Sequence, residues 1–598
     1  MKLSENHLLV LTGPELKVWE GRQMICLGRW VGIHVSDDFW SDKSLVFIPE
    51  PWDDRNKLSV DYAYLESIHD RLLKSIVKSL NRFHKTNYSE RYWTAILDPW
   101  LVSYVAVLFD RWERLSRAFE KRDSYIVLTS KESLFHKRPF FSGNEYLNLI
   151  QDDSWNHELL VDMLNYAYHD RVVFKNVAHL DFFDKGSKQP PLDLKSKCLQ
   201  IAKRKIQTYL KLIQKFHSHL CEKFRLIPKV YLHLVGLNFF GNLRFNFALR
   251  QYPFYRPYFP DSISGVGNQD HQKNLDSINL QPQSDFERYL ERRIVLDMPD
   301  EFLGCFKKIN DRVKKIPSPK IITSDMDHWY SSYFKHWLAK SIENGSKVII
   351  CQHGGSLTQG ALFAMNYEER ISDSFAIWSS PLHRSHIQLP PVKYFGLSFA
   401  YNSGTKIYLS VIGYDAPRYI MRCQINANSG QVYSHYQQII NFYDGLSDKL
   451  KCNFRIRPYQ DQGWRFPEKY KKFFGSNKVD SLSSYQSFLA RSRVVVCTYP
   501  ETTFSDCIAR DIPVILLYPP VFWELHPEMD SLLQLLIKAK IVFRNHKEAC
   551  NHIAMVWDDP YNWWKSKEVV AVIREYRERA LKSDEAFIPS WLDLFGKT

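Results

Sequence analysis

The chain has 598 residues, of which 45% are hydrophobic and 15% aromatic, so it can bury large cores and is too long for one ordinary domain. Its formal charge of +14 suits nucleic acid, an anionic membrane surface or an anionic small substrate. The spacings that define RNA-recognition, zinc-finger and helix-turn-helix modules are missing, so we expect no nucleic acid partner. An anionic small substrate is enough to explain the positive charge of the chain.

The ten cysteines are scattered, and their spacing fits neither a zinc motif nor a disulfide framework, which predicts a reducing compartment. Residues 1–13 lack the basic start and the small-residue cleavage site of a signal peptide. No window approaches the roughly 20 consecutive apolar residues that a membrane-spanning helix needs. We therefore expect a cytoplasmic protein, for which any membrane contact would be peripheral.

In chain order, the first part of the sequence combines short strands with long helices. Leu8–Thr12 and Tyr125–Leu128 have the apolar, β-rich pattern of buried strands, whereas Val60–Phe83 has apolar residues at helical spacing. Another helix is expected to open at Asp153 or Ser154, either of which can cap its first turn. The segment Leu194–Lys223 is amphipathic and basic, and we interpret it as a helix with a solvated face.

The middle of the chain changes character twice. Phe239–Gln283 is rich in aromatic residues, Pro, Gly, Asn and Asp without a sustained period, so it is predicted to be an insertion or a large loop. A strand at 321–323, a helix at 330–344 and strands at 347–351 and 374–378 follow. This alternation favours a parallel sheet with crossover helices.

A second strand–helix rhythm follows the turn-forming residues 400–404. We expect strands at 407–412, 454–456, 494–497 and 514–517, and helices at 434–450, 485–490 and 503–510. The sequence thus predicts an α/β protein in which two Rossmann-like domains face a central cleft, the GT-B arrangement, with helical additions in the N-terminal half. The domains are expected at 1–400 and 401–565, with a helix in 566–598 packing back on the N-terminal domain.

The segment 347–356 (KVIICQHGGS) is an apolar strand that ends in small and polar residues. Ligands collect at the carboxyl ends of parallel strands, where loops and helix N-termini offer unpaired N–H groups. Gly354 and Gly355 allow close backbone approach, and His353 can act as a general base or bind a phosphate oxygen. The alternative is a plain strand-to-helix turn in which His353 satisfies a backbone carbonyl.

The segment 493–519 contains the second polar strand end, Thr498–Thr503 (TYPETT). Thr498, Thr502 and Thr503 are expected to bind a donor phosphate together with the N–H groups of the next helix, and Glu501 to hold sugar hydroxyls. Equally ordinary roles exist, since the threonines can be helix caps and Glu501 a first-turn charge that the helix dipole favours.

Two charged residues complete the predicted donor site. Arg457 follows the strand 454–456, where its guanidinium can clamp a pyrophosphate, although an ion pair within the domain is nearly as plausible. Glu524 follows Trp523 beyond the strand 514–517 and can contact the donor. Tyr414, Asp415 and Arg418, which follow the strand 407–412, are weaker candidates for the site. The acidic pair in Asp325–Asp327 (DMD) is interpreted as helix-capping chemistry, so we expect no metal and no cofactor.

Several motifs resemble the surface-carbohydrate (O-antigen biosynthesis) transferase family, with a more distant similarity to CDP-glycerol glycerophosphotransferases and GT-B glycosyltransferases. The matching segments are Gln352–Gly355, Glu369–Ser379, Thr498–Asp511, Pro513, Trp523–Glu524, Val556–Trp564, Arg91–Trp93, Asp98–Trp100 and Asp153–Asn156. They span nearly the whole chain. The chain departs from this pattern at Ser356–Thr358, where the resemblance leads us to expect Tyr-Gly.

The resemblance implies a cytoplasmic bacterial transferase, peripheral at the inner membrane, that acts in lipopolysaccharide or other surface glycan assembly. It would move a glycosyl group from a nucleotide-activated sugar donor to a glycan or lipid-linked acceptor, without a metal. His353 in the first domain would deprotonate the acceptor, and the second domain would hold the donor. Alternatives are a polyol-phosphate transferase, similar to those that use CDP-glycerol, and a non-catalytic glycan-assembly binding protein.

Overall fold

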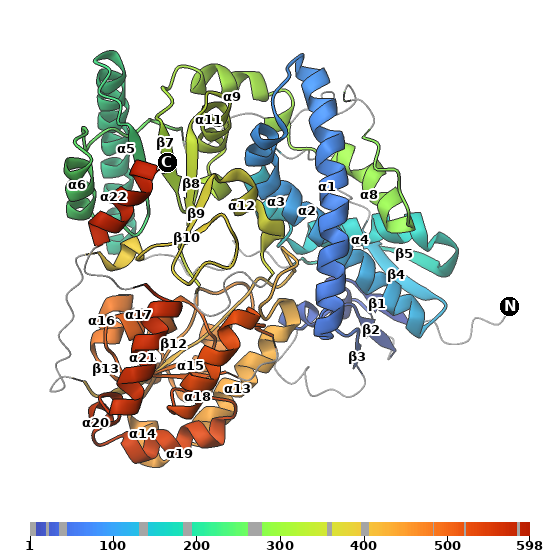
Figure 1. Cartoon of the computed structure of the whole chain (residues 1–598). Coiled ribbons are helices and arrows are strands. Elements are labelled where there is room, and N and C mark those ends of the chain that lie inside the picture. The colour runs from blue at the N-terminus through green and yellow to red at the C-terminus, as the bar shows by residue number, and fades with distance from the viewer. Residues whose placement is uncertain are drawn as a thin grey trace.

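The computed structural model describes residues 7–19, 23–34, 45–130, 141–182, 194–260, 275, 278–355, 362–395, 406–481, 483–518, 522–582 and 587–597. The turn-forming residues 400–404, the predicted domain boundary near 400 and Ser356–Thr358 lie outside these ranges. The described chain is an α/β protein with three five-stranded sheets (Figure 1), and all their strand pairs are parallel. The sequence predicted two such units. The difference arises because the part before residue 400, which was predicted as one domain, builds two separate sheets.

The additional sheet, sheet A, is formed by the first 177 residues. Its strands are β1 (Leu8–Val10), β2 (Met24–Cys26), β3 (Leu45–Phe47), β4 (Tyr125–Ser130) and β5 (Val172–Val177), in the order β3-β2-β1-β4-β5. Strand β1 is buried along its whole length, as expected for a central strand of a parallel sheet covered on both faces. Helices α3 (Gly143–Leu149) and α4 (Asp153–Ala167) connect β4 to β5.

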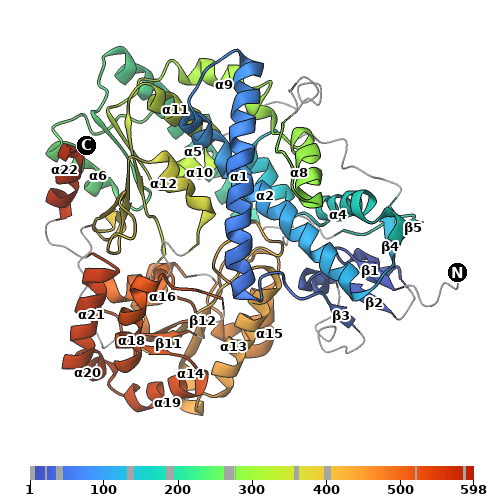
Figure 2. The same ribbon diagram turned by 45° about the vertical axis from the view of Figure 1, so that its right-hand side comes forward.

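Two long helices, α1 (Arg55–His84) and α2 (Glu90–Lys121), occupy the middle of the molecule. Asp54 caps α1, and Ser89 caps α2. Figure 2 shows these helices between sheet A and the second sheet. Among the described helices, α2 alone is long and apolar enough to cross a membrane, but its apolar window is entirely buried inside the protein. The charges on α2 find partners there, since Asp98 accepts from His69 Nε2 at 3.0 Å.

Sheet B follows, in the order β10-β9-β8-β7-β6. Its strands are β6 (Val230–His233), β7 (Ile321–Ser324), β8 (Lys347–Cys351), β9 (Ser374–Ile377) and β10 (His386–Gln388). Its helices are α5 (Leu194–Lys223), α6 (Phe239–Ala248), α9 (Phe306–Val313), α10 (Asp327–Tyr330), α11 (Ser332–Glu343) and α12 (Tyr367–Ile371). Helix α8 (Asp285–Leu296) lies between them in sequence but packs against α2 and α4, on the side of sheet A. The predicted loop 239–283 therefore starts with a helix, which Asn238 caps through the N–H of Gly241.

Sheet C has the order β12-β11-β13-β14-β15. Its strands are β11 (Tyr408–Ile412), β12 (Phe454–Arg457), β13 (Ser492–Cys497), β14 (Val514–Leu517) and β15 (Val542–Phe543). Its helices are α13 (Val432–Asp444), α14 (Asp448–Asn453), α15 (Phe466–Phe474), α16 (Tyr485–Ala490), α17 (Thr502–Ala509), α18 (Asp530–Lys538), α19 (His546–Val556) and α20 (Pro560–Trp564). The helix predicted over 434–450 is interrupted because Gly445 ends α13.

The last two helices attach to different sheets. Helix α21 (Lys567–Arg579) packs against α18, and its buried Tyr576 contacts Phe504 of α17 with ring centroids 5.6 Å apart. Helix α22 (Phe587–Lys597) instead packs on α6, where Trp591 and Phe587 surround Phe245. The segment 566–598 thus begins on the side of sheet C and ends on the side of sheet B.

A buried polar network joins the loop after β11 to the helices that flank sheet A. Arg418 pairs with Asp153 at 2.7 Å, and the Tyr419 hydroxyl donates to the same carboxylate at 2.8 Å. Arg111 of α2 donates to the carbonyl of Ile420 at 3.0 Å. All these side chains are buried, so the N-terminal unit holds this loop in one position.

Candidate functional site

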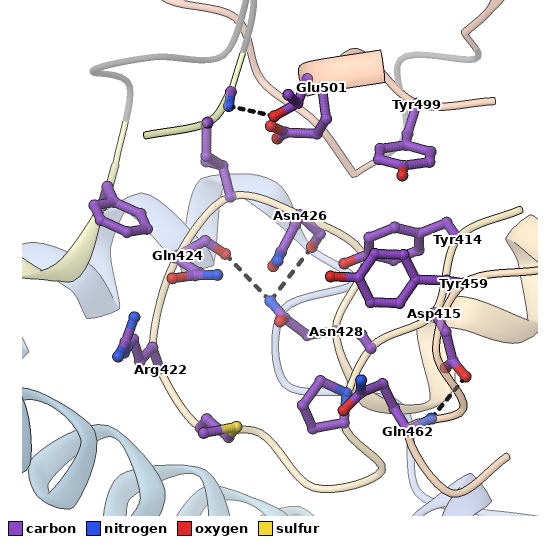
Figure 3. Close-up of a pocket in the computed structure, with 18 of the residues that line it drawn as sticks. Tyr414, Asp415, Arg422, Gln424, Asn426, Asn428, Tyr459, Gln462, Tyr499 and Glu501 are labelled. Carbon is purple, nitrogen blue, oxygen red and sulfur yellow. Dashed lines mark hydrogen bonds between the residues drawn. The ribbon is translucent and has the colours of Figure 1, made fainter. Parts of the chain in front are cut away.

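One pocket, with a volume of about 690 Å³, opens where the carboxyl ends of β8 and β13 meet the loop after β11. Figure 3 shows its interior. The lining residues are Leu147, Tyr330, Gln352, His353, Gly354, Gly355, Phe363, Glu368, Tyr414, Asp415, Ala416, Pro417, Tyr419, Met421, Arg422, Gln424, Ile425, Asn426, Asn428, Tyr459, Gln462, Tyr499, Glu501, Thr502, Thr503 and Trp523. Six of the nine predicted site residues are among them.

The loop after β8 is fixed by Gln352. Its side-chain amide donates to the carbonyl of Gly354 at 2.8 Å and accepts from the N–H of Trp378 at 2.8 Å. Gly355 has φ of 96°, in the left-handed region that favours glycine. The loop therefore presents the exposed imidazole of His353 to the pocket on a rigid support.

The surroundings of His353 set its protonation state. The imidazole is open to solvent on the pocket side and enclosed by protein elsewhere, and this desolvation lowers its pKa. The carboxylates of Glu368 and Asp325 are close enough to oppose the shift without reversing it. His353 is therefore neutral near pH 7, the state in which it can accept a proton.

A buried cluster lies behind His353. His328 Nε2–H donates to Glu368 Oε1 at 3.0 Å, and Trp329 Nε1–H donates to the same oxygen at 2.9 Å. Burial opposes ionisation of Glu368, but the hydrogen bonds from His328 and Trp329 hold its pKa below the usual value. A fixed negative charge on Glu368 would stabilise a proton on His353.

The acidic pair after β7 does not cap a helix, so the helix-capping interpretation is wrong. Met326 occupies the N-cap position of α10 and makes no capping bond. Asp325 Oδ2 accepts from the N–H of Val235 at 2.8 Å, and Asp327 pairs with His233 at 2.7 Å. Burial raises the pKa of Asp325. Both carboxylates tie the ends of β6 and β7 together.

The start of α17 meets the glycine loop directly. The N–H of Gly355 donates to Thr502 Oγ1 at 2.9 Å, and a Cβ added to Gly354 would lie 3.0 Å from the same oxygen. Glu501 occupies the N-cap position but makes no side-chain capping bond, and its carboxylate lines the pocket with Thr503 (Figure 3). The two predicted loops are thus brought together, and a side chain at position 354 would crowd Thr502 Oγ1.

Three predicted site residues contact other parts of the protein. Thr498 Oγ1 donates to the carbonyl of Ile412 at 2.7 Å and accepts from His435 Nε2 at 2.8 Å, so it stabilises the sheet. Arg457 Nη1 donates to the carbonyl of Ser483 at 2.9 Å.

The third of them, Glu524, pairs with Arg55 Nη2 at 2.8 Å, across to the start of α1. None of the three is a lining residue of the pocket.

Aromatic rings form one wall of the pocket. Tyr414 packs against Tyr499 and Trp523, with ring centroids 4.9 and 5.1 Å apart, and Tyr499 stacks on Trp523 at 6.2 Å. Tyr459 lines the same side and is about half exposed (Figure 3). A wall of this kind suits a flat base or the apolar face of a sugar ring.

The loop after β11 supplies polar groups that sequence reasoning missed. Arg422, Gln424, Asn426 and Asn428 follow one another at every second position along this loop, as Figure 3 shows. Asn428 Nδ2 donates to the carbonyls of Gln424 and Asn426 at 3.2 and 3.3 Å. Gln424 Oε1 and Asn426 Oδ1 are buried and have no hydrogen-bond partner within the described ranges.

Arg422 brings a positive charge into the pocket. Its guanidinium lies 4.2 Å from the centroid of the Trp329 ring, and its Nε donates to Ser103 Oγ at 3.4 Å. Burial lowers its pKa, but an arginine remains charged. In the part of the chain that the structure describes, no carboxylate is within ion-pair distance of this guanidinium, which leaves it available to an anionic ligand.

Comparison with known proteins identifies the family. The sequence matches the LIC12162 family transferase over residues 7–595. The chain belongs to this family of transferases. No functionally curated protein matches it. The crystal structure of MurG from Acinetobacter baumannii matches 48% of this chain and 78% of its own, with 9% identity and a TM-score of 0.29, too low to establish a common fold.

For this LIC12162 family member, the alternating polar pattern 422–428 was the sequence signal that could have located the missed residues. The pattern was overlooked because the loop lacks regular structure and lies far in sequence from both glycine and threonine motifs. Within the described ranges, no group of three or more His, Cys, Asp or Glu residues is arranged to hold a metal ion.

Proposed function

We propose that this protein is a glycosyltransferase of the GT-B type that moves a glycosyl group from a nucleotide-activated sugar to a glycan or lipid-linked acceptor in cytoplasmic surface glycan assembly, such as that of O-antigen or lipopolysaccharide. One observation carries the proposal. A single pocket combines a neutral histidine, the N-terminus of α17 and the guanidinium of Arg422. These groups suit proton removal from an acceptor and neutralisation of a diphosphate leaving group.

In the proposed arrangement, sheets B and C are the two Rossmann-like halves of the enzyme. The loop after β8 brings His353 to the acceptor, and the loops after β11 and β13 hold the donor. The nucleoside would lie along Tyr414, Tyr499 and Trp523, and Glu501 would accept hydrogen bonds from sugar hydroxyls. Sheet A is an addition that supports the donor half.

His353 would take the proton of the acceptor hydroxyl. The hydroxyl oxygen then bonds to the anomeric carbon while the bond from that carbon to the diphosphate breaks, and the nucleoside diphosphate leaves with the electron pair. Glu368 and Asp325 would stabilise the imidazolium that forms, since both act to raise the pKa of His353. His328 and Trp329 hold Glu368 in place.

Arg422 and the N–H groups at the start of α17 would neutralise the departing diphosphate, so transfer is proposed to need no metal. Turnover should then be unchanged when a chelator such as EDTA is added. Restored activity on adding Mg²⁺ to a chelated, inactive enzyme would exclude this part of the proposal.

The first experiment is a calorimetric screen of the purified protein against CMP-, CDP-, UDP-, GDP- and dTDP-linked sugars. Arg422→Gln should lose the binding of the nucleotide class that the protein prefers, whereas the matched variant Arg457→Gln should keep it, because Arg457 is turned toward Ser483. Product formation with lipid-linked and free glycan acceptors would then establish transfer.

The other outcomes of the screen distinguish the alternatives. Turnover with CDP-glycerol and not with nucleotide sugars would identify a polyol-phosphate transferase. Saturable binding without turnover on any acceptor would favour a non-catalytic glycan-assembly protein. Binding that survives Arg422→Gln would contradict the proposed donor site.

A further inference from the structure

Helix α5 presents an apolar stripe to solvent. Its side chains are described from Thr208 onward, and Tyr209, Leu212, Ile213 and Phe216 are exposed by 68, 57, 63 and 66%. The intervals between them are those of one face of a helix, the pattern that normally faces a core. The amphipathic pattern of α5 predicts a polar solvated face, but in the structure the apolar stripe faces the solvent.

The opposite side of α5 is the packed one, although it is polar. Gln214 donates to the carbonyl of Pro257 at 3.5 Å, and His217 hydrogen-bonds the Tyr252 hydroxyl at 3.0 Å. One turn further, Ser218 Oγ accepts from the N–H of Tyr258 at 3.3 Å. The helix is therefore held to the segment 252–258 through its polar face, which leaves the stripe directed outward.

The segment around the stripe carries most of the net charge of the protein. Residues 194–260 contain thirteen lysines and arginines and one acidic residue, Glu222, a formal charge of +12 within a chain of +14. Lys211, Lys215 and Lys223 of the same helix are also exposed. The exposed surface of α5 thus carries both apolar and basic side chains.

A second group of exposed aromatic residues belongs to the same segment. Phe239 and Phe240, at the start of α6, are exposed by 62 and 75%, and Phe254 lies 6.4 Å from Phe239 between ring centroids. In Figure 1, α5, α6 and α22 gather at the end of the molecule that is remote from sheet A. The whole end of the protein beyond sheet B is therefore basic and partly apolar.

We propose that the stripe on α5, flanked by its lysines, is a docking surface for an anionic lipid bilayer. The apolar side chains would enter the boundary between headgroups and acyl chains, and the lysines would contact the phosphates. A second copy of this chain is a poorer occupant, because a two-fold contact would bring two segments of charge +12 together. The inference does not depend on the transferase chemistry of the pocket.

The test measures binding of the full-length protein to vesicles by co-sedimentation. Vesicles of phosphatidylcholine are compared with vesicles of phosphatidylcholine and phosphatidylglycerol in equal parts. One variant replaces Tyr209, Leu212, Ile213 and Phe216 by serine, and a second carries Lys211→Glu and Lys215→Glu. The control variant carries Val60→Ser and Met555→Ser, which remove two exposed apolar side chains elsewhere.

The wild-type protein and the control should bind the anionic vesicles, with binding that weakens as salt is added. Both α5 variants should partition at least about tenfold more weakly, since each lysine near an anionic surface contributes measurably. The circular dichroism spectrum of each variant should match that of the wild type, which checks that the variants remain folded.

Three results would overturn the inference. The first is equal binding by the serine variant and the control, and the second is no binding by the wild type to either vesicle. The third is a wild-type dimer in light scattering that the serine variant converts to a monomer, which would assign the stripe to a second copy. Because the vesicles contain no donor or acceptor, these results leave the proposed transferase function unaffected.

Discussion

The unit built around sheet A and the units built around sheets B and C contribute unequally to the pocket. Sheet A and its helices supply Leu147, from α3, to the lining, whereas the loops after β8, β11 and β13 supply the polar groups. The N-terminal unit instead fixes the loop after β11 through Asp153 and Arg111. One unit thus acts as a support, while the other two carry the site.

The largest effect should come from the loop after β8. His353→Gln removes the proposed base and is expected to lower kcat/KM about 10²- to 10⁴-fold, because general base catalysis contributes that much. The side chain is exposed, so the midpoint of thermal unfolding should not change. His383→Gln, at another exposed histidine outside the pocket, is the control and should retain activity. Equal activity in both variants would remove His353 from the mechanism.

The supporting role of the N-terminal unit is tested at Asp153. Asp153→Asn leaves the buried guanidinium of Arg418 without its charge partner and should lower the free energy of unfolding by about 3–5 kcal/mol in urea denaturation. Asp558→Asn breaks an exposed pair with Lys449 and should leave the denaturation midpoint unchanged. If both variants are equally stable, Asp153 does not anchor the loop.

The next largest effect is expected from the hydrogen bond between the loop after β8 and the start of α17. Thr502→Val keeps the shape of the side chain but leaves the N–H of Gly355 without its acceptor, at a cost of about 1–3 kcal/mol. We expect weaker donor binding in calorimetry, with a smaller change in kcat. Thr208→Val, an exposed threonine on α5, should bind the donor as the wild type does.

The pH dependence of the rate follows from the state of His353. Its pKa is lowered by burial, so the neutral form persists below the ordinary histidine pKa of about 6.5. The rate should be flat near pH 7 and should fall only as the pH drops through this lowered pKa. Measurement of kcat/KM against pH gives the position of the acid limb, and a limb centred above pH 7 would contradict the assignment.

The smallest effect is expected at a residue that the sequence placed in the donor site. Arg457→Gln should leave the Kd for the donor within about twofold of the wild type. The guanidinium donates to the carbonyl of Ser483, and its central carbon lies 5.8 Å from the centroid of the Phe488 ring. A tenfold loss of donor affinity would show that Arg457 turns toward the ligand when it binds. In that case the site would include the end of β12.

Sequence patterns identified most strands of sheets B and C and the two motifs that meet at the pocket. The strand β8, the helix α16 and the strand β14 have the predicted bounds, because polar or turn-forming residues mark both ends of each segment. Strands at 8–12 and 125–128 were predicted, but not that they form a sheet of their own, because the two long helices α1 and α2 separate them in the sequence. Arg457 and Thr498 were assigned by their position at strand ends, but side-chain direction decides which residues enter a pocket.

The sequence by itself determined the α/β class, the glycine loop with His353 and the threonine loop that opens α17. The spacing of apolar residues and the turn-forming residues at the ends of elements are local properties of the chain. Tertiary structure decided the number of sheets, the partners of Arg457 and Glu524, and the placement of Arg422 in the pocket. It also decided that the apolar stripe of α5 is exposed. These features depend on which surfaces meet across hundreds of residues, and local patterns do not encode such contacts.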